Sequence, residues 1–228
     1  MIKTRFYILF ISSYLISYLS IFIRFLKHDL NLNQSFDSFF FNSDAVFFGN
    51  IAKDVILRNG DFSSWMLAGA PEIFPTIFLS FFIPFITKNY FISQIIFSII
   101  QFLIFNILFI CIINVFTEKK YAMVAGVLSN IILVFFLFDK PYNYIFIASH
   151  HFGCFINFLI CLLFVSYKSI HKKNNFILLS FLVFIFSFSN PIFIPYFVLP
   201  LIFCFQIFFN QKKVILKNIG FIIFAFSG

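Results

Sequence analysis

Long apolar runs that are almost free of charge constrain this chain more than any other feature. Six of them span residues 6–26, 90–116, 121–138, 152–167, 176–189 and 192–209. A membrane-spanning helix needs about 20 mostly apolar residues. Only 11% of the residues are charged, whereas average soluble domains carry roughly 25%. This composition excludes a soluble enzyme, a disordered tail and a nucleic-acid-binding domain. The sequence therefore predicts an all-α fold, a polytopic transmembrane helical bundle.

The charged residues indicate how the runs are arranged across the membrane. The net charge is +8, and cytoplasmic loops of membrane proteins carry an excess of Lys and Arg. The short run 73–87 contains Pro75 and Pro84. If this run does not cross the membrane, the positively charged loops fall on one side of it and most acidic residues on the other. We therefore expect a retained first span at 6–26 with a cytoplasmic N-terminus. Residues 27–89 form one long outer segment with juxtamembrane helices.

The remaining spans lie within 90–228, in one transmembrane domain covering 1–228. Ser189-Asn190-Pro191 is expected to form a turn, because the residue before proline resists the helical conformation. Asn106, Asn130 and Asn157 lie in or near spans and are expected to form interhelical hydrogen bonds. A seventh apolar run begins at Ile219 and stops at Gly228, which predicts that the chain is the N-terminal part of a longer protein.

The outer segment contains most of the carboxylates. Residues 43–60 have the pattern of an amphipathic helix that lies on the membrane surface. Ser43 or Asp44 is expected to cap its start, and Asn59-Gly60 to end it with glycine in the left-handed conformation. Trp65 follows, and tryptophan is enriched at the membrane–water interface.

The order of these elements resembles the GT-C superfamily of membrane glycosyltransferases, including its protein mannosyltransferase and aminoarabinose transferase branches. The resemblance covers roughly residues 1–116. It depends on Asp44, Lys53-Asp54, Asn59-Gly60, Trp65 and Pro71-Glu72-Ile73-Phe74-Pro75, in that order. It implies sugar transfer from a polyprenyl-phosphate donor at the outer face of a bacterial inner (cytoplasmic) membrane. The implied partners are membrane lipid and that donor, and nucleic acid is not expected.

The resemblance also implies roles for individual residues. Asp44 would take the proton from the acceptor hydroxyl, or it is only a helix N-cap. Cationic side chains would stabilise the departing phosphate. The candidates are Arg58, Lys53, Lys88, His150 and His151, with Arg58 preferred because its guanidinium matches phosphate oxygens. Arg58 near a helix end is alternatively explained by the helix dipole. Glu72 is either a second carboxylate of the site or a solvated loop residue. The sequence identifies no cofactor and leaves a divalent metal open.

Two other functions remain open on the sequence alone. One is a non-enzymatic polytopic membrane protein, such as a flippase or a transporter subunit. The absence of Asp, Glu or Lys deep in any predicted span argues against proton-coupled transport, which needs such groups. The other is a truncated fragment without activity.

Overall fold

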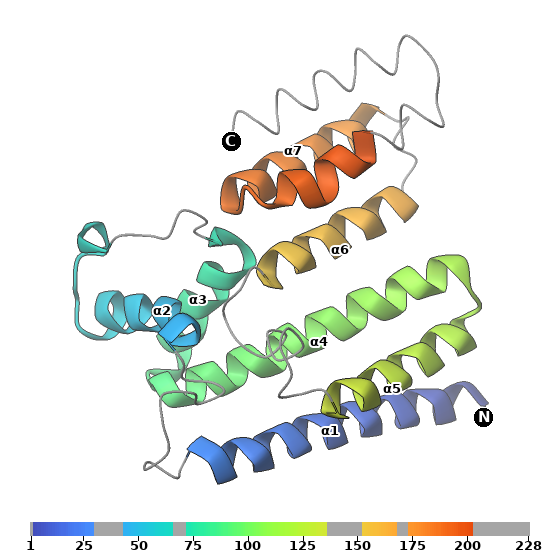
Figure 1. Ribbon diagram of the computed structural model, residues 1–228, viewed down its shortest axis with the longest axis horizontal. Helices are drawn as coiled ribbons and strands as arrows, with labels where there is room; N and C mark the ends of the chain where they lie inside the picture. Colours follow the sequence, from blue (N-terminus) through green and yellow to red (C-terminus); the bar gives the residue numbers. More distant parts are fainter. Residues whose placement is uncertain (1, 30–42, 66–71, 136–151, 168–172, 203–228) are drawn as a thin grey trace. The chain divides into compact units, whose positions relative to one another are not determined.

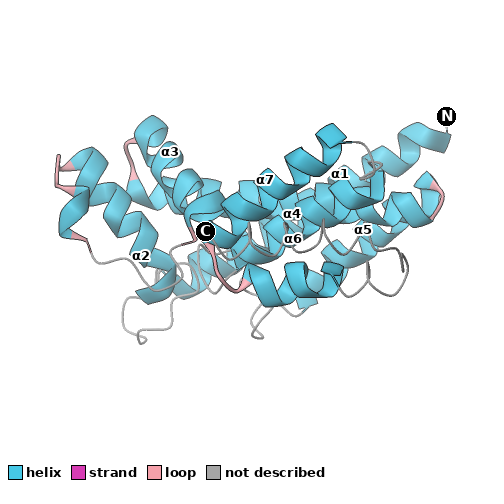
Figure 2. Cartoon of the chain, turned by 90° about the horizontal axis from the view of Figure 1, so that it is seen from above, coloured by secondary structure: helices cyan, strands magenta, loops and turns pink. Residues whose placement is uncertain are grey.

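The computed structural model describes residues 2–29, 43–65, 72–135, 152–167 and 173–202, and every regular element in these ranges is a helix. Figures 1 and 2 show the helices and their order. They are α1 (Ile2–Asp29), α2 (Ser43–Ala52), η1 (Lys53–Leu57), η2 (Phe62–Ser64), η3 (Ile73–Ile77), α3 (Phe78–Thr87), α4 (Tyr90–Phe116), α5 (Lys119–Phe135), α6 (Phe152–Tyr167), α7 (Lys173–Ser189) and η5 (Ile194–Val198). For the described residues this confirms the predicted all-α class.

The chain divides into two compact units, which are described separately. Unit 1 comprises Met1–Trp65 and Leu79–Phe152, and unit 2 comprises Met66–Phe78 and Gly153–Gly228. The boundary falls within the helical stretch 73–87. The turn-rich motif that precedes α3 therefore packs with the C-terminal helices, whereas most of α3 packs with the N-terminal ones.

Unit 1 is built on α1, α4 and α5, with α5 packed along both of the others. Side-chain hydrogen bonds join these helices. The Tyr14 hydroxyl donates to the Ile99 carbonyl at 3.0 Å, and the Tyr18 hydroxyl donates to the Ile95 carbonyl at 2.9 Å. The Asn130 amide nitrogen donates to the Ser13 hydroxyl at 3.1 Å. The expected interhelical role of Asn130 is thus confirmed.

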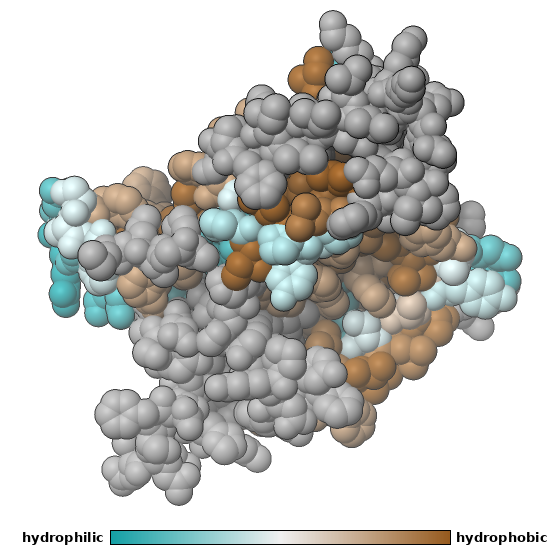
Figure 3. Space-filling view, turned by 45° about the horizontal axis from the view of Figure 1, so that its top comes forward, coloured by the Kyte–Doolittle hydropathy of each residue, from teal (hydrophilic) through white to brown (hydrophobic). Residues whose placement is uncertain are grey.

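Unit 1 buries polar side chains and exposes large apolar ones. Its buried side chains include many polar ones, namely Ser17, Ser93, Gln94, Ser98, Gln101, Asn106 and Asn130. Large apolar side chains are exposed instead, among them Leu15 and Ile16 of α1 and Leu128 and Ile132 of α5. Figure 3 shows such hydrophobic side chains at the surface of the described helices. Water disfavours this arrangement, whereas lipid tails do not.

Among the described residues, one helix is long and apolar enough to cross a membrane. It covers Ile92–Phe116, with a mean hydropathy of 2.8 in its most apolar window, and 28% of that window is buried within the protein. The core helix of a soluble protein would be mostly buried. Four shorter apolar helices accompany it, at Ile8–Ser20, Ile73–Thr87, Phe152–Tyr167 and Asn174–Ser189.

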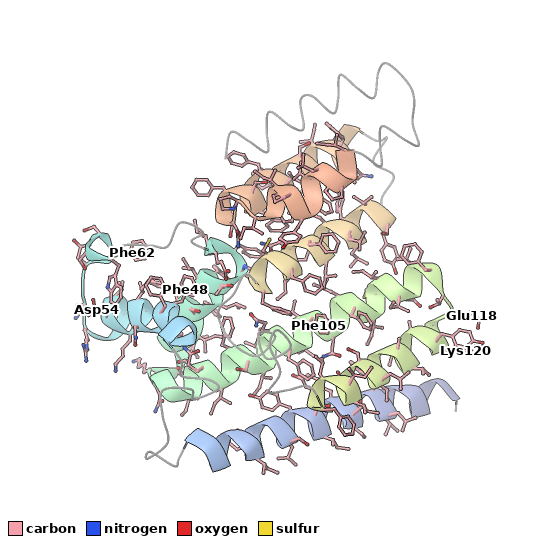
Figure 4. The ribbon with its side chains drawn as sticks, in the orientation of Figure 1. Phe48, Asp54, Phe62, Phe105, Glu118 and Lys120 are labelled. Carbon is pink, nitrogen blue, oxygen red and sulfur yellow. The ribbon has the colours of Figure 1, made fainter. Side chains whose placement is uncertain are left out.

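Three charged residues of unit 1 lie toward opposite ends of α4. Asp54 lies at one end, and Glu118 with Lys120 at the other (Figure 4). The first turn of α1 lies at the same end as the turn between α4 and α5 (Figure 1). Asp54 and the first turn of α1 thus lie toward opposite ends of α4.

Unit 2 packs the segment before α3 against α6, α7 and η5. Its apolar core consists of Cys154, Cys161, Leu179, Val183, Phe186, Phe193, Phe197, Val198 and Ile202. The predicted turn is confirmed, since α7 ends at Ser189. The Asn190 side chain accepts a hydrogen bond from the Ile192 N–H at 3.1 Å, and the Asn190 carbonyl accepts one from the Phe193 N–H at 2.9 Å.

The predicted helix over residues 43–60 is shorter than expected. The α-helix ends at Ala52, a wider π-helical turn follows, and the helical conformation ends at Leu57. The left-handed residue is Asn59, with φ of 56°, and not Gly60. Asparagine tolerates this conformation. Gly60 is needed for another reason, because a Cβ there would lie 2.6 Å from Oδ2 of Asp54.

Candidate functional site

The structure places the seven predicted site residues in three different situations. Asp44 is the second residue of α2, and its side chain lies outside the described part. Lys53, Arg58 and Lys88 belong to unit 1 and Glu72 to unit 2. His150 and His151 lie outside the described residues.

Lys53 and Arg58 lie further along the helical segment that contains Asp44. Positions 44 and 53 are nine residues apart along a helix, which separates them by about 14 Å and places them on opposite faces. Arg58 lies further along still, at the end of η1, where it is exposed. It forms no ion pair with any other described residue. Both cations therefore belong to the far end of this helix.

The turn after η1 is organised around the carboxylate of Asp54. The Trp65 indole N–H donates to Asp54 Oδ2 at 3.0 Å, and the Trp65 ring meets Phe47 edge to face. The Asp54 carbonyl accepts from the backbone N–H groups of Arg58 and Gly60 at 3.2 and 3.0 Å. Trp65, predicted as an interfacial anchor, is thus also fixed by a charge-assisted hydrogen bond.

Next along the chain, Asp61 caps the short helix η2. Its carboxylate accepts bonds from the Ser63 N–H at 2.9 Å and from the Ser63 hydroxyl at 2.6 Å. These hydrogen bonds favour the charged form and lower the pKa of Asp61 below its usual value. Within the described ranges, no three His, Cys, Asp or Glu side chains come close enough together to hold a metal ion.

We predict that substituting Gly60 with Ala breaks the bond between Asp54 and Trp65. The added methyl group would displace the Asp54 carboxylate, and the freed indole would become more exposed to water. Trp65 is the only tryptophan, so its fluorescence reports on this turn alone. Gly60→Ala and Asp54→Ala should both shift the emission to longer wavelength. Asp61→Asn, which alters a neighbouring carboxylate without contact to the indole, should leave it unchanged, and an unshifted Gly60→Ala spectrum would contradict the assignment.

Glu72 is the buried carboxylate of the structure, and it stands at a break in the helical stretch before α3. Its side chain is 4% exposed, and its backbone is left-handed, with φ of 49°. The Thr76 hydroxyl donates to Glu72 Oε2 at 3.3 Å, and the Ile77 N–H donates to the Glu72 carbonyl at 3.1 Å. The expectation of a solvated loop residue is therefore wrong, because within unit 2 the segment packs against α6 and α7.

The first turn of α6 packs against this carboxylate. A Cβ placed on Gly153 would lie 2.5 Å from the Thr76 hydroxyl, 3.1 Å from Cδ of Pro75 and 3.8 Å from Glu72 Oε2. Only glycine allows so close an approach without displacement. The N-terminal end of α6, which carries a partial positive charge, therefore lies beside the Glu72 carboxylate.

Phe74 connects Glu72 to α3 in an extended conformation, with φ of −121° and ψ of 133°. Its peptide groups are bonded by side chains from two other helices. The Phe74 N–H donates to the Ser189 hydroxyl at 2.8 Å. The Phe74 carbonyl accepts from that hydroxyl at 3.0 Å and from the Asn157 amide at 2.9 Å. The Phe74 ring stacks on Phe186 at 5.6 Å.

Sequence reasoning assigned Asn157 to bonds between spanning helices and gave Thr76, Gly153 and Ser189 no role at this site. One signal was present in the sequence. Residue 74 precedes Pro75, and such a residue is biased away from the helical conformation. A buried break of this kind needs hydrogen-bond partners for the backbone, and small polar residues in apolar helices are natural candidates.

No known protein family, curated protein or solved structure matches this chain.

Proposed function

We propose that this chain is a polytopic integral membrane protein with its N-terminus in the cytoplasm. The exposed apolar and buried polar side chains of unit 1 support the proposal. The charged residues at the two ends of α4 further support it. On this proposal α4 crosses the membrane, and the turn formed by residues 53–65 lies on the outer face. The inner membrane of a bacterium is the setting that the resemblance implies.

We predict that two introduced cysteines will report on opposite sides of the membrane. Lys88 precedes α4 and Lys120 follows it, and both side chains are exposed. In intact cells a membrane-impermeant maleimide should label Lys88→Cys, and it should label Lys120→Cys only after the cells are opened. Equal labelling of both would contradict the span. Labelling of Lys120→Cys alone would reverse the orientation.

We further propose that the protein transfers a sugar from a polyprenyl-phosphate donor at the outer face. The buried carboxylate of Glu72 carries this proposal, because it lies in the Pro71–Pro75 motif on which the resemblance depends. Dedicated contacts hold it there. A buried carboxylate held by neighbouring groups is costly to maintain, and such groups are typical of functional sites.

In the proposed reaction Asp44 takes the proton from the acceptor hydroxyl while the hydroxyl oxygen attacks the anomeric carbon. The bond from that carbon to the phosphate oxygen breaks, and polyprenyl phosphate leaves as an anion. Glu72 is the second carboxylate that the resemblance implies for this reaction. Lys53 and Arg58, at the far end of the α2–η1 helix, attract anionic head groups to the surface.

The experiment is an assay of donor cleavage in reconstituted vesicles. The purified chain is placed in vesicles containing polyprenyl-phosphate-linked hexoses or pentoses, water supplies the acceptor hydroxyl, and release of polyprenyl phosphate is measured. We expect release by the wild type and a rate at least about tenfold lower for Glu72→Gln, which keeps the side chain's shape but removes its charge. Asp61→Asn, an exposed carboxylate outside the motif, serves as the control. Absence of release by the wild type with every donor would favour a non-enzymatic membrane protein or an inactive fragment.

A further inference from the structure

The backbone of Phe74 is held by a pair of side chains that the proposed chemistry does not use. Ser189 is the last residue of α7, and Asn157 lies within α6. They are 1% and 0% exposed, and they are 115 and 83 residues away from Phe74 in the sequence. Together they form three hydrogen bonds to one residue. We call Ser189 and Asn157 the Phe74 clamp.

The clamp replaces the hydrogen bonds that the helix break removes. At ψ of 133° the Phe74 peptide does not continue the helical pattern. Leaving a buried backbone group without a hydrogen-bond partner is unfavourable. Ser189 supplies an acceptor to the N–H and a donor to the C=O through one hydroxyl, and Asn157 adds a second donor to the same carbonyl. The peptide groups before and after Phe74 are thereby both fixed in orientation.

Fixing Phe74 also fixes Glu72, which is only two residues before it. The direction of the chain at Phe74 determines where the Glu72 carboxylate lies relative to the first turn of α6. The left-handed backbone of Glu72, with φ of 49°, is an unfavourable conformation for a residue with a side chain. It persists only when its surroundings enforce it. The clamp and the stacking of Phe74 on Phe186 supply that constraint on the C-terminal side of Glu72.

We propose that Ser189 and Asn157 are positioning residues that hold Glu72 in its buried site. The proposal depends on the proposed function only for the catalytic use of Glu72. It assigns a role in the site to α6 and α7, which lie outside the part of the chain that carries the resemblance. The outer-segment motif is incomplete without them.

Two measurements test the clamp without an activity assay. The first is hydrogen exchange of the Phe74 amide, whose acceptor is the Ser189 hydroxyl. The second is modification of Glu72 by an apolar carbodiimide, which reacts with carboxyl groups within membrane proteins. In Ser189→Ala we expect both rates to rise by about tenfold or more, as for a buried amide that loses its acceptor. Ser189→Thr keeps the hydroxyl and should restore protection.

The matched control lies on the same helix. The Ser180 hydroxyl donates to the Phe176 carbonyl, one turn earlier in α7, at 2.9 Å. Ser180→Ala removes a hydroxyl without touching the motif, so neither rate should change. Exchange along α4, which belongs to unit 1, reports whether each variant is folded. If Ser189→Ala gives a folded protein in which exchange at Phe74 or modification of Glu72 stays at the wild-type rate, the positioning role is wrong.

Asn157 gives a second, independent variant. Asn157→Leu keeps the volume of the side chain but removes the amide donor to the Phe74 carbonyl. It should raise the modification rate of Glu72, and unchanged modification would overturn its part in the clamp.

The vesicle assay separates this proposal from the proposed function. A lower kcat with little change in KM in Ser189→Ala, restored in Ser189→Thr, supports both. If the wild type releases no polyprenyl phosphate, but Ser189→Ala still exchanges and is modified faster than the wild type, the transferase proposal is wrong and the clamp proposal stands. If Ser189→Ala releases polyprenyl phosphate with the wild-type kcat, the positioning role of Ser189 is wrong and the transferase proposal stands.

Discussion

Replacing Asp44 with Asn is expected to lower the rate of sugar transfer by roughly 10²- to 10⁴-fold, the usual contribution of a general base. The choice of Asn separates catalysis from helix capping. Asn and Asp are about equally good N-caps, so α2 should keep its stability and the protein its expression level. An Asn side chain cannot take the proton from the acceptor hydroxyl. The rate is measured as release of polyprenyl phosphate from vesicles.

Asp44→Ala provides the comparison, because it removes both the base and the cap. It should lose the same activity and in addition destabilise α2 by about 1 kcal/mol. Full activity in Asp44→Asn combined with destabilisation in Asp44→Ala would assign Asp44 to capping alone. The general base would then have to be sought elsewhere, with Glu72 as the next candidate.

The second large effect is expected at Gly153. Its Cα lies so close to the motif that an added Cβ would lie 2.5 Å from the Thr76 hydroxyl and 3.1 Å from the Pro75 ring. Inserting a larger side chain into a packed region typically costs about 1–3 kcal/mol. Gly153→Ala should therefore destabilise unit 2, and Gly153→Leu should displace Glu72 altogether. Thermal unfolding in detergent, combined with carbodiimide modification of Glu72, measures both consequences.

Gly126 in α5 is the matched control for Gly153. A Cβ there would also approach a neighbour closely, at 2.7 Å, but the neighbour is Cδ1 of Ile110, the flexible end of a side chain. Gly126→Ala should thus cost less than Gly153→Ala, and it should leave the modification of Glu72 unchanged. Equal effects at both positions would show that general overpacking, and not the fit against the motif, explains the result.

The sequence predicted the helices well because their apolar runs are long and clearly bounded. The helix over 90–116 matches its predicted limits, and the turn at Asn190 follows from the proline after it. The limits of α2 were less predictable. The pattern of apolar residues continues to Ile56, but the change to a π-helical turn at Lys53 depends on contacts that follow later, including that of Asp54 with Trp65.

The candidate site was only partly predictable. The motif around Glu72 was recognised from its prolines and its single acid, but its burial was not, because the partners that bury it come from α6 and α7. Asn157 and Ser189 are isolated polar residues in apolar helices, a pattern that fits ordinary helix contacts equally well. No local rule in the sequence connects them to a residue about 100 positions away. The polar residues of the outer segment can thus be identified from the nearby sequence. The distant side chains that form hydrogen bonds to this segment cannot.

The long separation between Phe74 and Ser189 has a consequence for biogenesis. The ribosome adds roughly 5–20 residues per second, and 115 residues separate the two partners. A newly made chain therefore exposes an acidic, proline-rich stretch for on the order of ten seconds before the helix that shelters it has been synthesised. During that interval the insertion machinery, and not the native fold, must protect this stretch from non-native contacts and from proteolysis.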